Sequence, residues 1–378
     1  CSFGYQGGKS MKDAPYVGNY VHSLYDKCYK YVDCIILTSD TNIRYFTEAN
    51  ISEAIFFAAR TGAWCYLFVD SRYYEDACRE AMNCEVVLRK NIKKQLSECF
   101  EKHGVTRIGI EAEHLTVSKF VDLKMNFPKI EILDSNFVSS GIEVIRTNKT
   151  DSELNKIHKA QLISEQALDS LIKNDIREGV SERYLAAKYY EYISRFGAEK
   201  TAFDTIVLFG SNSSKPHGVP SNRTLKKGTN ILIDCGAKYY GYCSDMTRNI
   251  FFGTPTDKYL NVYNIVLEAQ KRAIEKVAFE ARLEDIDAAA RDYIKEQGYG
   301  DKFGHATGHG VGMDIHEYPS IAPQEPCVHP IIEDRMVVTI EPGIYLPGNF
   351  GVRIEDLIAV KKDKVYNLTN FSKELIVL

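Results

Sequence analysis

The stretch Asn230–Phe252, NILIDCGAKYYGYCSDMTRNIFF, holds two apolar segments on either side of a short polar centre. This pattern predicts two antiparallel strands joined by a tight turn. With Tyr239 and Tyr240 at the turn, the pairing places Asp234 directly opposite Asp245. Like charges in facing positions destabilise a sheet, and Asp234 ends the apolar run ILI, which favours burial. We therefore expect a proton or a cation between the two carboxylates.

A second stretch repeats this arrangement. Val337–Val360, VVTIEPGIYLPGNFGVRIEDLIAV, predicts a hairpin with its turn at Pro347–Asn349. This register places Glu341 opposite Glu355, whereas a slip by one residue would pair Glu341 with Asp356. A single acid in a strand is usually an edge or turn residue, but two facing pairs with apolar flanks favour a site. Carboxylate oxygens suit Mn²⁺, Mg²⁺ or Ca²⁺, and two such ions can share bridging oxygens.

Histidines concentrate in His305–Glu317, HATGHGVGMDIHE, which holds three of the nine in the chain. His305 and His309 have the spacing of the zinc-binding HExxH helix, but Ala306 stands where that motif has glutamate. The interleaved glycines disfavour a helix, so we expect a loop or a strand. An imidazole beside carboxylates favours a transition metal. His217, in the Pro/Gly-rich loop SSKPHGVPS, is a further candidate.

The composition is that of a globular protein with room for two domains. The chain has 378 residues, of which 44% are hydrophobic and 26% charged, and its net charge is -4. This mild acidity gives no electrostatic footprint for nucleic acid or for an anionic membrane, so we expect neither as a partner. Apolar runs such as EAIFFAA are far shorter than the ~20 residues needed to span a bilayer.

The cysteines and the first residues bear on the compartment and the native start. Ten cysteines without a CxxC pair predict free thiols in a reducing compartment, which we take to be the cytoplasm. The opening CSFGYQGGKS starts at Cys1 and has the character of a tag remnant or an incomplete start, which would make Met11 the native first residue.

The first part of the chain alternates strands and helices. Strands are predicted at Val32–Thr38 and Ala63–Asp70, and a helix at Arg72–Met82. The alternation continues to the segment that ends near Asp151. Residues 1–145 therefore predict a small α/β domain.

From residue 146 the predicted order becomes helix, helix, hairpin, and this order then repeats. The first two helices start near Thr150 and at Ser181, and the next two cover residues 259–279 and 283–297. The order hints at an internal duplication, although no repeat of the sequence itself accompanies it. Residues 146–378 are predicted to form the second, larger domain.

Five segments between Arg146 and Leu378 together resemble the pita-bread metallopeptidases, which include aminopeptidase P, prolidase, methionine aminopeptidase and creatinase. The segments are FDTIVLFGSNSSKPHGVPSNRTLKKG, ILIDCGAKYYGYCSDMTRNI, FGHATGHGVGMDIHEYP, VVTIEPGIYLPGNFGVRIED and FSKELIVL. Upstream, TSDTNIRYFTEAN and LFVDSRYYEDA resemble the smaller N-terminal domain of the prolidase and aminopeptidase P branch. The resemblance implies an α+β pita-bread catalytic domain, with internally duplicated helix pairs and antiparallel hairpins, and a smaller N-terminal α/β domain of the creatinase and prolidase type.

The resemblance also implies the metal ligands. They fall on Asp234, Asp245, His309, Glu341 and Glu355, which selects Glu355 over Asp356. Asp245 and Glu355 would bridge two divalent ions, Asp234 would hold one of them, and His309 and Glu341 the other. Mn²⁺ is the expected metal, with Co²⁺ or Zn²⁺ as alternatives.

Other residues of the family pattern fall on the substrate side. They are His217, His305, His316 and Arg353, the last as a support for the ligand glutamate. Two positions depart from the pattern: Cys235 stands where an aromatic residue is frequent, and Arg335 where glycine is frequent.

The activity that the resemblance implies is hydrolysis of the bond before proline at the N-terminus of a peptide. Two divalent ions would activate a water molecule, and Glu341 would pass its proton to the leaving nitrogen. His305 and His316 would stabilise the oxyanion or hold the scissile carbonyl. Phe203 and Tyr345 would line the proline pocket, and His217 would either line it too or move with its loop. Since the N-terminal domain in such relatives commonly caps the neighbouring subunit's site, we expect a homodimer.

Three alternatives stay open. An Xaa-Pro dipeptidase (prolidase) must recognise the carboxylate of proline, usually with an arginine, and Arg335 is the only arginine between His316 and Glu341. We favour aminopeptidase P over this reading. Metal-free chemistry of the creatinase type and a non-catalytic binding protein are both disfavoured, because the complete set of five ligands is present.

Overall fold

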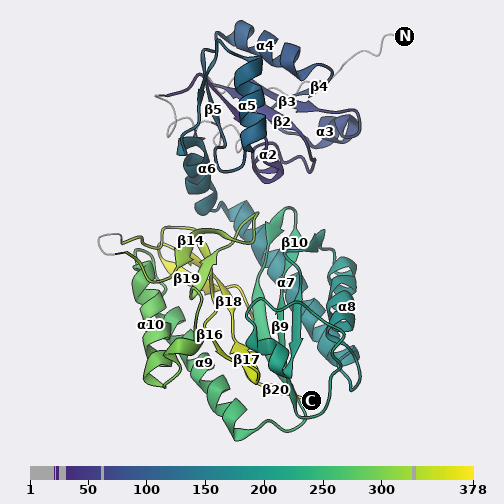
Figure 1. Cartoon of the computed structure of the whole chain (residues 1–378), viewed down its shortest axis with the longest axis vertical. Helices are drawn as coiled ribbons and strands as arrows, with labels where there is room; N and C mark the ends of the chain where they lie inside the picture. Colours follow the sequence, from purple (N-terminus) through teal and green to yellow (C-terminus); the bar gives the residue numbers. More distant parts are fainter. Residues whose placement is uncertain (1–20, 22, 25–30, 61–63, 326–328) are drawn as a thin grey trace. The chain divides into compact units, whose positions relative to one another are not determined.

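The structure is a computed structural model of the whole chain, and it describes residues 21, 23–24, 31–60, 64–325 and 329–378. The choice between Cys1 and Met11 as the native start lies outside the described residues. The chain divides into two compact units, and the boundary lies between Arg146 and Thr147 (Figure 1).

The first unit is a mixed sheet with helices. Within the described residues, six strands form this sheet in the order β4-β3-β2-β1-β5-β6, in which β1 pairs with β2 antiparallel and with β5 parallel. The strands are β1 (Cys34–Leu37), β2 (Ile55–Ala59), β3 (Cys65–Val69), β4 (Glu85–Leu88), β5 (Arg107–Ile110) and β6 (Glu131–Leu133). The helices are α2 (Asp40–Thr47), α3 (Tyr74–Glu80), α4 (Ile92–His103), α5 (Val117–Asn126) and α6 (Phe137–Thr147).

Local signals explain where these elements form. The strand β1 is an unbroken apolar run and is buried along its whole length, as expected of a strand covered on both faces. Helix α4 starts where the side chain of Asn91 accepts a hydrogen bond from the Lys94 amide, and it ends at Gly104, whose φ is 62°. The predicted alternation of strands and helices is confirmed for this unit.

The second unit repeats a helix pair followed by antiparallel strands. Its first half contains α7 (Asp151–Asn174), α8 (Glu182–Arg195), β7 (Lys200–Thr201), β8 (Ile206–Phe209), η2 (Gly210–Ser214), β9 (Thr229–Cys235), β10 (Ala237–Tyr239), β11 (Tyr242–Cys243) and β12 (Met246–Phe252). Its second half contains α9 (Asp257–Lys276), α10 (Leu283–Glu296), η3 (Gly300–Lys302), β13 (Gly308–Gly310), β14 (Glu317–Ile321), β15 (Val337–Ile340), β16 (Gly343–Leu346), β17 (Phe350–Arg353), β18 (Asp356–Lys361), β19 (Lys364–Asn367) and β20 (Ile376–Val377).

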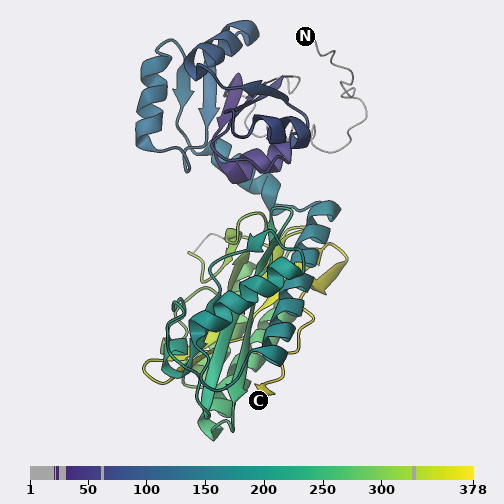
Figure 2. The same cartoon turned by 90° about the vertical axis from the view of Figure 1, so that its right-hand side faces the viewer.

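Each helix pair covers its own set of strands in this unit. In Figure 1, α7 and α8 lie on one side of the strands and α9 and α10 on the other, and Figure 2 gives the view from the side of α7 and α8. One apolar core joins α7 and α8 to β8, β9 and β12, with Leu168 and Tyr189 fully buried. A second core joins α9 and α10 to β15–β18, with Val266 and Ile286 fully buried. The predicted pita-bread architecture with its two helix pairs is confirmed.

The helices of this unit start at side chains that cap them. Thr150 and Glu153 form a capping box at the start of α7, and Ser181 caps α8 as predicted. Helix α9 starts at Asp257, two residues before the predicted Tyr259, because Thr256 supplies the cap. Among the described residues, no helix combines the length and apolar character needed to cross a bilayer.

The predicted register of the first hairpin is wrong by two residues. Asp234 pairs with Thr247 and not with Asp245. The reason is the turn, which is formed by Tyr240 and Gly241, both with positive φ (44° and 83°), whereas we placed Tyr239 and Tyr240 there. Because side chains alternate with a period of two, this shift leaves both acids on the same face of the sheet.

The predicted register of the second hairpin is confirmed. Leu346 pairs with Phe350 across the predicted loop, and Gly348 at its centre has a φ of 74°. Further along, Ile340 pairs with Asp356. Glu341 and Glu355 directly follow and precede this last pair, so the same register places them opposite one another.

Candidate metal and active site

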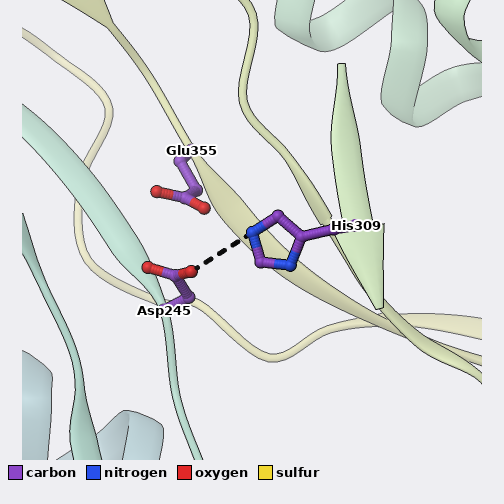
Figure 3. Close-up of side chains that lie close together, drawn as sticks. All are labelled: Asp245, His309 and Glu355. Atoms are coloured by element: carbon purple, nitrogen blue, oxygen red, sulfur yellow. Dashed lines mark ion pairs between the residues drawn. The ribbon is translucent and has the colours of Figure 1, made fainter. Parts of the chain in front are cut away.

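Three side chains from distant parts of the second unit converge in its interior. Asp245 lies just before β12, His309 lies in β13, and Glu355 lies between β17 and β18. One potential ligand atom from each lies within 4.8 Å of the other two. Figure 3 shows the two carboxylates and the imidazole pointing towards a common point, with the approach of His309 to Asp245 marked.

The other two predicted ligands are linked to this cluster, Glu341 through His309 and Asp234 through Arg353. His309 Nε2 is 3.4 Å from Glu341 Oε1 and 3.6 Å from Asp245 Oδ2. Asp234 is connected through Arg353, whose Nη2 donates a hydrogen bond of 2.7 Å to Asp234 Oδ2 and whose Nε is 3.9 Å from Glu341 Oε2. The other oxygen of Asp234, Oδ1, is buried and has no hydrogen-bond partner.

Burial and mutual repulsion make these acids hard to ionise in the absence of a cation. Burial is the main cause that raises the pKa of Asp245 well above its usual range, and the charges of Glu355 and Asp234 add to it. The pKa of Glu355 is raised in the same way, by burial and by the charges of Glu341 and Asp234. Burial also raises the pKa of Glu341 to about 8, although the charge of Arg353 opposes this rise.

His309 presents an unshared electron pair to these acids. Burial lowers the pKa of His309 to about 4, so the ring is neutral near neutral pH. Its Nδ1 lies 3.0 Å from the carbonyl oxygen of Gly310, which can only accept, so Nδ1 carries the ring hydrogen. The lone pair of Nε2 therefore faces the carboxylates of Asp245 and Glu341.

This donor set fits a divalent cation. A neutral imidazole lone pair facing carboxylates repels them unless a cation or protons lie between. The buried, unpaired Oδ1 of Asp234 is a further oxygen without a partner. Carboxylate oxygens and one imidazole are the ligands that a dinuclear divalent site uses.

A chain of hydrogen bonds runs from Asp234 to His305. Arg353 Nη1 donates to the hydroxyl of Tyr345 at 2.8 Å, and that hydroxyl lies 2.9 Å from His305 Nε2. His305 Nδ1 lies 2.7 Å from the carbonyl oxygen of Ala306, so Nδ1 donates there and Nε2 accepts from Tyr345. Burial lowers the pKa of His305 to about 4. Both ring nitrogens of His305 are thus engaged, and the Tyr345 hydroxyl links His305 to Arg353.

The remaining predicted residues are His316, His217 and Phe203. The ring centre of His316 is 4.4 Å from that of His309, and burial lowers the pKa of His316. His217 is exposed in the loop after η2, and a positive charge there would lower the pKa of both His305 and His316. Phe203 is half-buried and packs against the backbone at Gly236, two residues after Asp234.

Sequence reasoning missed two threonines that hold the acids. Thr247 Oγ1 donates to Glu355 Oε2 at 2.7 Å and accepts from Arg353 Nε at 3.0 Å. Thr339 Oγ1 lies 3.3 Å from Glu341 Oε1. The signal was present, since Thr247 follows Asp245 and Thr339 precedes Glu341 by two residues, on the same face of a strand.

Arg335 is engaged away from these residues. Its guanidinium forms a two-point ion pair with Asp151 at the start of α7, with distances of 2.8 and 3.3 Å. Its φ is 65°, a conformation that glycine adopts without strain, which explains why glycine is frequent at this position in the family pattern.

Both units of the chain match known families. Residues 155–362 match metallopeptidase family M24, and residues 28–146 match the creatinase/prolidase N-terminal domain. An Xaa-Pro dipeptidase of Pyrococcus horikoshii is 37% identical over 345 residues, which cover 91% of this chain and 95% of that protein.

Solved structures also resemble most of the chain. An Xaa-Pro dipeptidase from Bacillus anthracis gives a TM-score of 0.89 at 34% identity and covers 96% of this chain and 100% of its own. An X-Pro aminopeptidase from Thermotoga maritima MSB8 gives a TM-score of 0.85 at 31% identity, with coverage of 93% and 100%. The predicted resemblance to this branch is confirmed.

Proposed function

The chain belongs to metallopeptidase family M24, and we propose that it is an exopeptidase that cleaves the bond between an N-terminal residue and a following proline. The observation that carries this proposal is the convergence of Asp245, His309 and Glu355 from three separate segments, with Asp234 and Glu341 beside them. The names of the relatives, Xaa-Pro dipeptidase and X-Pro aminopeptidase, support the choice of proline-containing substrates.

We propose that two divalent ions are held by Asp234, Asp245, His309, Glu341 and Glu355. The raised pKa values of Asp245, Glu341 and Glu355 support this, because the surrounding protein does not stabilise their negative charges and a bound cation would. The mixture of carboxylates with one imidazole favours Mn²⁺, with Co²⁺ or Zn²⁺ as alternatives. When bound, such ions lower the pKa of a water molecule and polarise a carbonyl oxygen.

In this proposal Glu341 moves the proton of the reaction. It accepts a proton from the attacking water and passes it to the proline nitrogen, which must be protonated as it leaves. The position of Glu341 supports this role, since its side chain is held by Thr339 and lies within 3.9 Å of Arg353. Arg353 keeps the carboxylates of Asp234 and Glu341 in place.

His316 is the better candidate for the contact with the oxyanion. Both nitrogens of His305 already serve Ala306 and Tyr345, so His305 acts by orienting the Tyr345 hydroxyl. His217 lies in an exposed loop within electrostatic reach of both other histidines, which suits a residue that closes over the substrate. We place Phe203 and the ring of Tyr345 at the pocket for proline.

Two candidate activities differ in the length of the peptide substrate that they prefer. We favour an aminopeptidase P-like activity on longer peptides, because Arg335, which could have bound the carboxylate of a dipeptide, is paired with Asp151. The second candidate, an Xaa-Pro dipeptidase, is favoured by the names of the relatives from Pyrococcus horikoshii and Bacillus anthracis.

An assay with paired substrates separates the candidates. Protein stripped of metal and reloaded with Mn²⁺ is given an Xaa-Pro dipeptide and an Xaa-Pro-Yaa tripeptide side by side. Cleavage of the tripeptide supports the aminopeptidase, and cleavage of the dipeptide alone supports the dipeptidase. Failure to cleave either with metal bound would contradict the proline-specific proposal.

We further propose a homodimer in the cytoplasm. In support, the seven cysteines within the described residues are free, as expected in a reducing compartment. Helix α5 exposes Val117, Val121 and Met125 at i, i+4 and i+8, with exposed fractions of 79%, 45% and 66%. Such a stripe suits an interface between subunits, and light scattering after gel filtration tests the dimer.

A further inference from the structure

Helix α10 holds the backbone of the segment that carries His305. Arg291 donates through Nη1 to the carbonyl oxygen of Phe303 at 3.1 Å and through Nη2 to that of His305 at 2.8 Å. The guanidinium also lies 4.3 Å from the centre of the Phe303 ring. A planar guanidinium donates in fixed directions, so these contacts fix the path of the backbone from residue 303 to residue 305.

Asp287, one turn earlier on α10, completes the support. Its carboxylate is buried and accepts from Arg291 Nε at 2.7 Å and Nη2 at 2.8 Å. It also accepts from the hydroxyl of Thr307 at 2.7 Å. The pair therefore binds residues 303–307 on both sides of Ala306. Because the carboxylate is buried, its loss of hydration is offset only by these hydrogen bonds.

Residues 303–307 contact the candidate site at two points. The carbonyl oxygen of Thr307 accepts a hydrogen bond of 2.7 Å from the amide of Glu341, the proposed proton carrier. The ring of His305 contacts Tyr345, which in turn accepts from Arg353. A displacement of residues 305–307 would therefore move Glu341 and the Tyr345 hydroxyl together.

We propose that Arg291 and Asp287 are positioning residues for the reaction. Their hydrogen bonds go to one another, to backbone carbonyls and to Thr307, so they act through His305 and Glu341 and not on the substrate. The consequence for turnover rests on the proposed function, whereas the consequence for the geometry of His305 does not. Such positioning matters because a displacement of the reacting groups by ~1 Å can reduce a rate about a hundredfold.

The test compares Arg291→Met with a matched control on the neighbouring helix. In α9, Arg272 pairs with Glu268 at 2.8 Å with the same i, i+4 spacing, and its guanidinium lies 3.9 Å from the ring of Tyr293. Arg272→Met thus removes an arginine that also has an acidic and an aromatic partner but lies away from residues 303–307. On an Xaa-Pro-Yaa peptide, Arg291→Met is expected to lower kcat at least about tenfold with a smaller change in KM. Arg272→Met is expected to leave both unchanged.

The conservative variant separates geometry from charge. Arg291→Lys keeps the charge but cannot donate to two carbonyls in a fork, so kcat should stay close to that of Arg291→Met. Full recovery of kcat in Arg291→Lys would overturn the proposal, and so would an unchanged kcat in Arg291→Met.

Histidine NMR on the metal-free protein gives a readout that does not depend on activity. The ring signal of His305, assigned with a His305→Gln variant, should shift or broaden in Arg291→Met and stay in place in Arg272→Met. An unmoved signal in Arg291→Met would overturn the positioning role even if the enzyme were impaired. If the wild-type protein cleaves no Xaa-Pro peptide, the proposed function fails, while the NMR comparison still decides the role of Arg291.

Discussion

Metal-free protein is expected to lose stability as the pH rises from 6.5 to 8. The cause is Glu341, whose pKa is raised by burial from 4.5 to about 8 in the folded protein. The folded state therefore keeps a proton that the unfolded chain releases. The stability that this proton contributes is fully present below pH 4.5 and is lost as the pH rises towards 8. His305 and His309, with pKa values lowered to about 4, contribute in the opposite sense, but only below pH 6.5.

The expected size follows from the same linkage. Each pH unit within this window costs about 1.4 kcal/mol per group, so Glu341 alone accounts for about 2 kcal/mol between pH 6.5 and 8. For a unit of this size that corresponds to roughly 4–8 °C in the midpoint of thermal unfolding. Asp245 and Glu355, whose pKa values are also raised, act in the same direction.

The assay is thermal unfolding of chelator-treated protein at several pH values, for the wild type and Glu341→Gln. The variant cannot ionise at this position, so its midpoint should fall by about 4–8 °C less than that of the wild type across the window. Glu178→Gln, the same change at an exposed position, is the control and should follow the wild type. A midpoint that stays level or rises between pH 6.5 and 8 in the metal-free wild type would refute the reasoning, as would equal slopes for the wild type and Glu341→Gln.

Three further predictions concern single residues. Arg353→Met leaves the buried carboxylate of Asp234 without its partner, so the metal-free protein should lose about 3–5 kcal/mol of stability, measured by denaturant unfolding, and turnover should fall; retention of both would contradict the assigned ion pair. Gly308→Ala would place a Cβ 1.9 Å from the carbonyl oxygen of Thr339, so β13 must move. The free energy of unfolding, measured with denaturant, should fall by about 1–3 kcal/mol or more, and an unchanged value would rule out this packing. Arg335→Gly relieves a positive φ but loses a surface ion pair, so stability should change by less than about 1 kcal/mol and the ratio of dipeptide to tripeptide cleavage should stay constant; a selective loss of dipeptide cleavage would assign carboxylate recognition to Arg335.

The two hairpins show how far strand pairing could be predicted. The PGN loop predicted a turn centred on Gly348, but the sequence alone left a slip by one residue open, and the structure decides for the register centred on Gly348. In the first hairpin the run YYG offers two candidate turns, and the left-handed conformation that Gly241 accepts decided for the later one. The error left Asp234 and Asp245 on the same face, so the acidic cluster could be predicted although the direct pairing was wrong.

Contacts between segments that are distant in the sequence could not be predicted from the sequence. The residue types at Arg291 and Asp287 predict an i, i+4 ion pair on a helix, but no local sequence pattern indicates that Arg291 donates to the backbone carbonyl of His305. Similarly, we assigned Tyr345 to a pocket wall, and only the fold shows that its hydroxyl links Arg353 to His305. Such links depend on how the second hairpin packs against the neighbouring strands, which no local pattern specifies.

The central claim is that the cluster around Asp245, His309 and Glu355 supports metal-dependent cleavage before proline. Its most direct test follows the hydrolysis of an Xaa-Pro-Yaa peptide while Mn²⁺ is titrated into the stripped protein, beside an Xaa-Ala-Yaa peptide and the Glu355→Gln variant. The account predicts that activity is absent without metal, reaches its maximum near two ions per chain, is confined to the proline peptide and is lost in Glu355→Gln. Full activity in the presence of a chelator, or equal cleavage of the alanine peptide, would contradict it.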